Sequence, residues 1–211
     1  MVQGTELAAL ASAKICHDVM GPITSLVQSL EMLKENDPSG KNSETIQLLD
    51  ESVQKMWAKL DYFRFAYGGA SSEGEGQLSE CRETATKLFA HLKPSLVWSA
   101  KDVPMPKPAV RVIMNLLVIA ADCLPRGGQV EIVSDANEIR IAASGDRAVM
   151  KGDVAIALRG DRPEMGYMTQ TVPALLTGVF ARQNGVELVA RESEGRIELI
   201  ARSARFKAMA A

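Results

Sequence analysis

His17 is the residue whose type and position most favour chemistry. Two residues rotate a helix by ~200°, so His17 lies about half a turn away from an apolar stripe that contains Ile15 and Val19. We therefore expect its imidazole to face solvent from the middle of a long helix. A neutral imidazole, with an unperturbed pKa of ~6.5, is nucleophilic near neutral pH. The simplest alternative is a solvated surface histidine.

The residues on the same helix face as His17 leave room for a docking molecule. Three of them are unusually small for a surface helix: Ala13, Gly21 and Thr24. Small side chains let the backbone of another protein come close to the imidazole. Lys14 lies nearby on the helix and adds a cation that favours an incoming anionic group. The pattern predicts a binding face around the histidine.

Asp18 and Pro22 complete this segment. Asp18 could orient the His17 imidazole or take its proton, and the alternative is a solvated helix acid. Pro22 lacks the N–H that would bond to the carbonyl of Asp18 in a regular helix. The sequence therefore predicts a kink just past the histidine.

Two amphipathic helices are predicted to position the segment. Residues 5–36 carry one apolar stripe, which the Asn-Asp-Pro-Ser-Gly run at 36–40 ends. A second helix begins at about residue 43, with apolar residues at steps of three and four. Two helices cannot surround a core, so this antiparallel hairpin predicts a symmetric dimer with a four-helix bundle. The stripe residues are Ile15, Val19, Leu26, Leu30 and Leu33, then Ile46, Leu49, Val53, Met56, Leu60 and Phe63.

The rest of the chain has a mixed helix and strand pattern. A Gly-, Ser- and Glu-rich run marks the boundary, so we assign residues 1–68 to the hairpin, 69–77 to a linker and 78–211 to a second domain. About five strands and four helices predict an α/β sandwich, which makes the whole chain an α+β protein. The helices are expected at about 79–91, 108–124, 149–158 and 171–183, and the strands at 95–100, 129–134, 138–144, 186–191 and 196–201.

Composition excludes several classes of protein. Hydrophobic residues make up 46% of the 211 residues and charged residues 24%, which is the balance of a chain that forms a core. The apolar runs are far shorter than the ~20 residues needed to cross a bilayer, and no secretory signal is visible. The net charge of −2 gives no reason to expect nucleic acid as a partner. Three separated cysteines and two histidines indicate a cytoplasmic protein without disulfides or a metal site.

Several segments resemble the motifs of histidine kinases and histidine phosphotransferases. The run His17-Asp-Val-Met-Gly-Pro22 is similar to their phosphoacceptor H box. Asn115-Leu-Leu-Val-Ile-Ala120 and Leu124-Pro-Arg-Gly-Gly128 resemble the N box of the kinase ATP-binding fold and the residues that follow it. Residues 171–201 resemble the C-terminal end of that fold. The likeness covers nearly the whole chain.

The departures from the kinase pattern are at the residues that bind the nucleotide and its magnesium ion. Ile119 stands where the kinase has an asparagine that ligates magnesium, and an apolar side chain supplies no oxygen. Ala143 and Arg147 replace the aspartate and the second glycine of the adenine-binding loop, and only Gly166 lies near the place of the glycine-rich lid. A hairpin with an H box joined to an ATP-binding fold without its ligands is similar to the ChpT family of alphaproteobacterial histidine phosphotransferases.

This resemblance implies a phosphorelay function, with cell-cycle regulation as its setting. A phosphoryl group would pass from a receiver aspartate of a hybrid kinase to His17 and on to aspartates of response regulators. The resemblance implies a cytoplasmic homodimer that binds no ATP, with Mg²⁺ held by the receiver. The composition predicts no bound metal and no nucleic-acid or membrane partner. A labile phosphoramidate suits reversible transfer, which needs mainly positioning and charge neutralisation. Two alternatives stay open: an ATP-dependent histidine kinase, and a non-catalytic pseudokinase scaffold that binds receivers.

Overall fold

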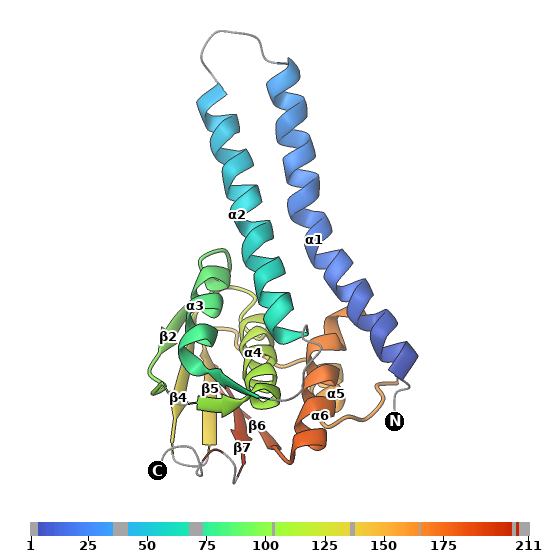
Figure 1. The fold of residues 1–211 in the computed structure, drawn as a ribbon, viewed down its shortest axis with the longest axis vertical. Coiled ribbons are helices and arrows are strands. Elements are labelled where there is room, and N and C mark those ends of the chain that lie inside the picture. Colours follow the sequence, from blue (N-terminus) through green and yellow to red (C-terminus); the bar gives the residue numbers. More distant parts are fainter. Residues whose placement is uncertain are drawn as a thin grey trace.

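A helical hairpin projects from an α/β domain (Figure 1). The hairpin consists of α1 (Gly4–Glu35) and α2 (Asn42–Ala66), which confirms the two predicted helices. The predicted stop between them, at 36–40, lies outside the described residues. Within the described ranges, no helix combines the length and the apolar character needed to cross a bilayer. The computed structural model describes residues 4–35, 42–67, 74–102, 104–135, 138–164, 166–203 and 206.

The hairpin helices pack against each other through the predicted stripes, which a single hairpin covers only in part. Val19 and Leu26 on α1 and Val53 on α2 are half-buried. Leu30 and Leu60 belong to the same predicted stripes but remain 48% and 39% exposed. Apolar surface is therefore left open on the hairpin.

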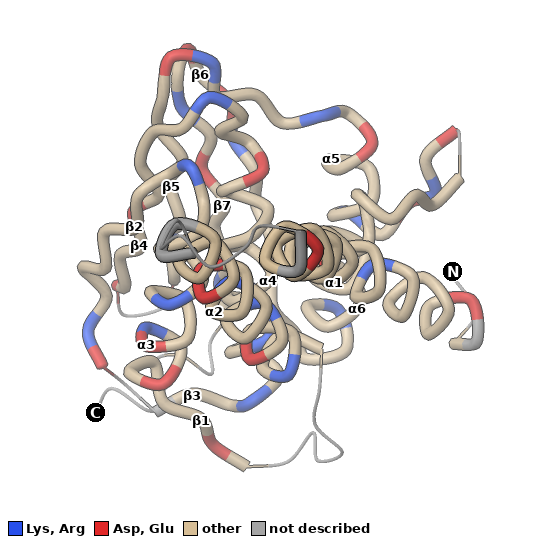
Figure 2. The backbone as a smooth tube through the Cα atoms, turned by 90° about the horizontal axis from the view of Figure 1, so that it is seen from above, with Lys and Arg blue, Asp and Glu red and all other residues tan. Residues whose placement is uncertain are grey.

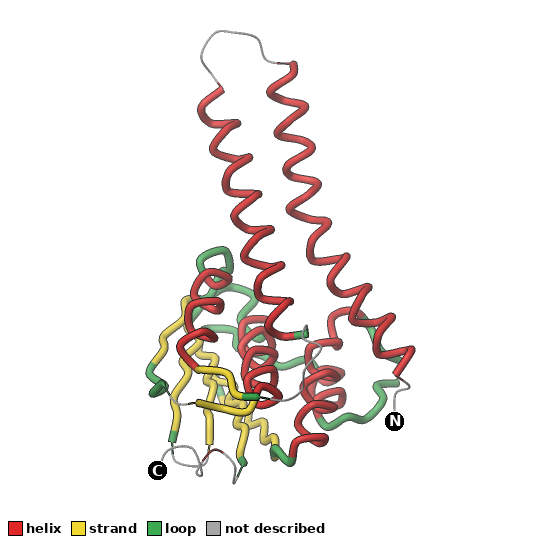
Figure 3. The backbone as a smooth tube through the Cα atoms, in the orientation of Figure 1, coloured by secondary structure: helices red, strands yellow, loops and turns green. Residues whose placement is uncertain are grey.

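The N-terminal half of α1 lies against the α/β domain. Leu7 and Leu10 pack against the domain core, and α1 contacts the short helix η1 (Thr169–Thr171) and α6 (Val172–Asn184). The helix runs through Pro22 without a break, and its axis changes direction along its length (Figures 1 and 3). The same helix therefore belongs to both parts of the molecule.

The α/β domain has a layer of helices on one five-stranded sheet (Figure 3). The strand order is β2-β4-β5-β7-β6, in which β2 is parallel to β4 and all other neighbours are antiparallel. The predicted hairpin-plus-sandwich fold class is confirmed. The strands are β2 (Ser95–Trp98), β4 (Gln129–Ser134), β5 (Glu138–Ser144), β6 (Glu187–Ser193) and β7 (Arg196–Arg202), and the remaining helices are α3 (Leu78–Phe89), α4 (Lys107–Asp122) and α5 (Gly152–Leu158).

Alternation along the central strands separates the two faces of the sheet. Ala143 on β5 and Ile197 on β7 are register partners and are fully buried beneath the helices. Because side chains alternate between faces, the next residue of β7 points the other way. There Glu198 forms an ion pair of 3.0 Å with Arg196. One face of the sheet is core, and charged pairs lie on the other.

A second, two-stranded sheet differs from the sequence prediction. β1 (Glu75–Gln77) pairs antiparallel with β3 (Pro104–Pro106) and holds Met105 in the core at 1% exposure. β1 lies inside the segment 69–77 that was expected to be a linker, of which residues 69–73 lie outside the described residues. Three-residue strands that contain Gly or Pro show too little alternation to be predicted from a sequence.

Asn115, the first residue of the N-box segment, joins the α/β domain to the hairpin. It is 1% exposed, and its Nδ2 donates to the carbonyls of Arg111 (2.8 Å) and Ala66 (3.3 Å), the last residue of α2. The Tyr62 hydroxyl donates to the carbonyl of Met114 beside it. These bonds fix the lower end of α2 on α4.

Candidate functional site

His17 lies on the exposed side of α1, where the sequence predicted it. Its side chain is 72% exposed. A Cβ added to Gly21, one turn further along, would meet nothing within 4 Å, so the space beside the imidazole is open. Ala13 and Thr24 are also exposed, and the Thr24 hydroxyl donates to the carbonyl of Met20 at 2.9 Å. A second protein can approach the imidazole without displacing a side chain of this face.

Asp18 holds the imidazole from one side. Its Oδ1 lies 3.1 Å from His17 Nδ1, and its side chain is only 15% exposed. When Nδ1 carries the proton and donates to this carboxylate, Nε2 keeps its lone pair. The contact therefore favours the tautomer in which Nε2 carries the free lone pair. This geometry fits an orienting role for Asp18 better than the removal of a proton from the reacting nitrogen.

Lys14 is engaged by Asp18 and is not free in solvent. Its Nζ lies 2.7 Å from Oδ2 and 3.0 Å from Oδ1 of that carboxylate, and its side chain is 12% exposed. The two residues are four apart on one helix, a spacing that lets opposite charges meet. The sequence suggested that Lys14 awaits an incoming anion. The structure shows its charge paired with the neighbouring Asp18 carboxylate, and its contact with an incoming anion stays a prediction.

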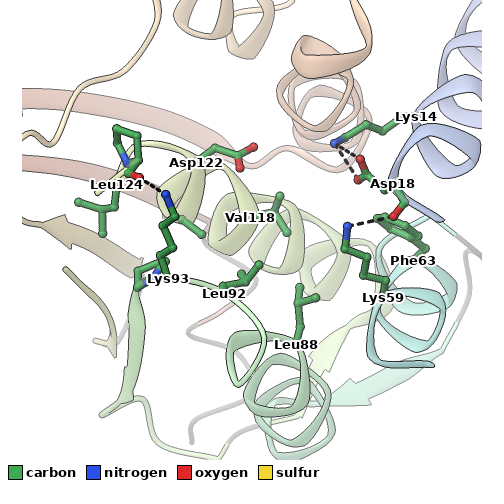
Figure 4. A pocket seen from close by; sticks show the side chains of 13 residues that line it. Lys14, Asp18, Lys59, Phe63, Leu88, Leu92, Lys93, Val118, Asp122 and Leu124 are labelled. Carbon is green, nitrogen blue, oxygen red and sulfur yellow. Dashed lines mark hydrogen bonds and ion pairs between the residues drawn. The ribbon is translucent and has the colours of Figure 1, made fainter. Parts of the chain in front are cut away.

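Lys59 of α2 completes the cluster, and sequence reasoning missed it. Its Nζ donates to the main-chain carbonyl of Asp18 at 3.0 Å (Figure 4). This carbonyl needs a partner because Pro22, four residues later, has no N–H. Burial lowers the pKa of Lys59, and the negative charge of Asp18 opposes that shift. Pro22 is the one sequence signal of an unsatisfied carbonyl, but it could not name the donor.

A cavity of about 390 Å³ lies between this cluster and the α/β domain. Figure 4 shows Lys14, Asp18 and Lys59 on its hairpin side, facing α4 across the space. Loss of hydration raises the pKa of Asp122 at the end of α4, although the residue keeps exposed surface. The domain side is mostly apolar and includes Leu88, Leu92, Val118, Ala121 and Leu124.

The positions that the motif resemblance aligns with nucleotide ligands of kinases are occupied by packed apolar residues. Ile119 is 3% exposed and Ala143 is fully buried. The space beside Ile119 is a cavity of about 250 Å³, with Lys14 of α1 in its wall. A Cβ on Gly128 would overlap the carbonyl oxygen of Ser144, so the Gly-Gly turn packs directly on the end of β5. In the described part of the chain, His, Cys, Asp and Glu do not form a group of three or more that could hold a metal ion.

Comparisons with known proteins identify the family of this chain. The family model "Histidine phosphotransferase C-terminal domain" matches residues 78–196. Protein phosphotransferase ChpT of Brucella abortus (strain 2308) is 31% identical over 128 residues, and the match spans 60% of this chain and 60% of that protein. A solved "1.7 Angstrom Structure of a Bacterial Phosphotransferase" superposes with a TM-score of 0.86 at 25% identity, covering 95% of this chain and 98% of the other. Since the family model covers more than half of the chain, the chain belongs to the histidine phosphotransferase family that this C-terminal domain defines.

Proposed function

We propose that this protein is a histidine phosphotransferase that carries a phosphoryl group between receiver domains, with His17 as the phosphoacceptor. The observation that carries the proposal is an imidazole that is 72% exposed and held at Nδ1 by Asp18, in a chain of this family. Its partners are the receiver domain of a hybrid kinase as donor and those of response regulators as acceptors. Its proposed location is the cytoplasm, where such partners work.

Each transfer exchanges one bond to phosphorus. The Nε2 lone pair of His17 attacks the phosphorus of a receiver aspartyl phosphate, a P–N bond forms, and the P–O bond to the aspartate breaks. The aspartate leaves as a carboxylate with the bonding electrons. The proton stays on Nδ1, where Asp18 accepts its hydrogen bond and stabilises the positive charge that develops on the ring. In the reverse sense, the aspartate of the next receiver attacks and the electron pair returns to Nε2.

The proposed docking surface for a receiver is the face of α1 that carries His17. Ala13, Gly21 and Thr24 are exposed and present little bulk, so a receiver backbone can approach the imidazole closely. The receiver brings the attacked or attacking aspartate and its own Mg²⁺, which neutralises charge on the phosphoryl oxygens. This chain positions the His17 imidazole and contributes the charge network of Lys14 and Asp18.

We further propose that the protein uses no ATP of its own. A cavity of about 250 Å³ is smaller than the ~300–1,000 Å³ of typical ligand pockets. Ile119 offers magnesium no oxygen, and Ala143 offers adenine no hydrogen-bond acceptor. Titration calorimetry with ATP and Mg²⁺ should show no binding at millimolar concentration. A dissociation constant tighter than about 1 mM, equal to ~4 kcal/mol, would favour the kinase alternative.

We propose a homodimer built through the hairpin. Exposed apolar residues recur along α1 at steps of three and four and continue on α2. Basic and acidic residues are interspersed over the described elements (Figure 2), so charge gives no comparable binding face. A second hairpin would cover this exposed stripe and complete a four-helix bundle. The exposed stripe comprises Met20, Ile23, Val27, Leu30, Ile46, Trp57 and Leu60.

Phosphate tracing with a matched histidine control tests the proposed function. A receiver domain carrying radiolabelled phosphate should label the unmodified protein, and His17→Gln should abolish the label. His91→Gln replaces the other histidine of the chain and should leave labelling intact. The label should be acid-labile and alkali-stable, as expected of a P–N bond. Label that persists on His17→Gln would reject His17 as acceptor, and receiver binding without any label would favour the scaffold alternative.

A further inference from the structure

We propose that Lys59 is a positioning residue for phosphotransfer. It binds the Asp18 carbonyl that Pro22 leaves free and so fixes the turn of α1 that carries His17. This inference rests on the proposed phosphotransfer function and adds to it a residue from the second helix of the hairpin.

The first step of the argument is the gap that Pro22 creates. In a regular helix, the carbonyl of Asp18 would accept from the N–H of the fourth residue onward, which is Pro22. Proline has no N–H, and its ring also disfavours a straight helix at this point. The turn that bears the imidazole is therefore the one turn of α1 that lacks a regular backbone bond because of a proline.

The second step is the geometry of the replacement donor. Lys59 Nζ reaches the Asp18 carbonyl at 3.0 Å from α2, 41 residues away in the chain. Lys14 holds the carboxylate of the same residue at 2.7 Å. Asp18 is thus held at its main chain by one cation and at its side chain by another (Figure 4). Bonds from a charged donor are stronger than those between neutral groups.

The third step connects this clamp to the reacting nitrogen. Asp18 Oδ1 contacts His17 Nδ1 at 3.1 Å, so contacts run from α2 through Asp18 to the imidazole. Lys59 is half-buried between the helices, where loss of hydration lowers its pKa. Its ammonium is held in a partly dehydrated place and bonds to the backbone of α1. Without this bond, α1 is free to bend at Pro22 and to move His17 and Asp18 away from a docked receiver.

A set of variants distinguishes a positioning role of Lys59 from a general contribution to the stability of the fold. Lys59→Met keeps a similar length but loses the donor, and Lys59→Arg keeps a charged donor. Pro22→Ala restores the N–H that the Asp18 carbonyl lacks, which makes Lys59 dispensable. Single-turnover transfer from a radiolabelled receiver, measured over a range of receiver concentrations, gives a maximum rate and a half-saturating concentration. Lys55→Met removes the same charge one turn away on α2 and serves as the matched control.

We expect Lys59→Met to lower the maximum rate by about tenfold to 10²-fold, because small misplacements of reacting groups have effects of this size. The half-saturating receiver concentration should stay close to that of the unmodified protein. Lys59→Arg and Lys55→Met should keep most of the rate. The double variant Pro22→Ala/Lys59→Met should recover most of what Lys59→Met loses.

Each contrary result has a defined meaning. The inference is overturned if Lys59→Met has the same maximum transfer rate as the unmodified protein. It is also overturned if the double variant Pro22→Ala/Lys59→Met stays as slow as Lys59→Met. If Lys59→Met does not fold, the ¹⁵N shifts of the His17 ring in Lys59→Ala, which has no side-chain donor and a high helix propensity, provide a second readout. A tautomer equilibrium identical to that of the unmodified protein then overturns the inference, and a changed one supports it. Absence of His17 label in the unmodified protein would instead refute the proposed function itself.

Discussion

Replacing Asp18 by Asn tests how the imidazole is prepared for transfer. The substitution keeps an oxygen that can accept from His17 Nδ1 but removes the negative charge. A hydrogen bond to a charged group is worth ~1.5–3 kcal/mol and a neutral one ~0.5–1.5 kcal/mol. The His17 side chain is 72% exposed, so solvent screening reduces the difference to ~0.5–1 kcal/mol. Since each ~1.4 kcal/mol is tenfold in rate, transfer should slow by about two- to fivefold.

The size of this effect distinguishes two roles for Asp18. Loss of a general base costs ~10²–10⁴-fold, far more than loss of an orienting charge. The assay is rapid-quench single-turnover transfer at saturating receiver, with Asp50→Asn, an exposed acid of α2, as control. A loss greater than ~10²-fold in Asp18→Asn, with none in Asp50→Asn, would refute the orientation argument.

The same variant has a second, independent readout in stability. Asp18→Asn leaves the Lys14 ammonium without its carboxylate partner, although that side chain is only 12% exposed. An unsatisfied polar group at such a place costs ~1–3 kcal/mol, which urea denaturation can measure. The double variant Lys14→Met/Asp18→Asn should regain much of this free energy of unfolding. A double variant less stable than Asp18→Asn alone would contradict the pairing described here.

Three further predictions concern the assembly and the cysteines. Val27→Glu with Leu60→Glu should give folded monomers in sedimentation, because each buried apolar side chain of this size contributes ~2 kcal/mol to a dimer; a stable monomer of the unmodified chain would contradict the proposed bundle. Burial raises the pKa of both Cys81 and Cys123 from the ordinary 9.0 to about 12. Only the unfolded chain ionises these thiols as the pH rises from 9, so stability should fall between pH 9 and about 12 and be unaffected by them below pH 9. Thermal denaturation of Cys→Ala variants, whose alkaline slope should be shallower, checks this. Iodoacetamide near neutral pH should modify exposed Cys16 in the native protein and the two buried thiols only after unfolding; equal labelling of all three would show the burial to be wrong.

The parts of the fold with a local repeat were predictable from the sequence. The apolar spacing along 5–36 and from residue 43 produced both hairpin helices, because a helical stripe is visible in one continuous segment. The strands β4 and β5 were predicted at the bounds they have, since alternation between turns is also local. By contrast, β1 and β3 gain their stability from pairing across about 30 residues, and neither segment alone shows a strand pattern.

The candidate site also has features that one helix alone predicts and features that depend on packing between helices. The exposed position of His17 follows from the angle between residues on one helix. Its contact with Asp18 was open to prediction because the two residues are adjacent, and Pro22 pointed to a free carbonyl. That Lys59 satisfies this carbonyl depends on how α2 packs beside α1, which no spacing within either helix determines. Lys14 was predicted as a cation for an incoming anion, and its low exposure of 12% depends on the docked domain, which the sequence does not show.

The sharing of α1 between the hairpin and the α/β domain affects the kinetics of the proposed relay. Because one helix runs through both parts, each protomer of the proposed dimer would present His17 in a single fixed setting to every receiver. Donor and acceptor must therefore occupy the same surface one after the other, which gives ping-pong kinetics. An excess of unphosphorylated donor should then compete with the acceptor and slow the relay. In the proposed relay, the concentrations and phosphorylation levels of the receivers would set the direction of phosphate flow, and this protein would act as a passive exchange point.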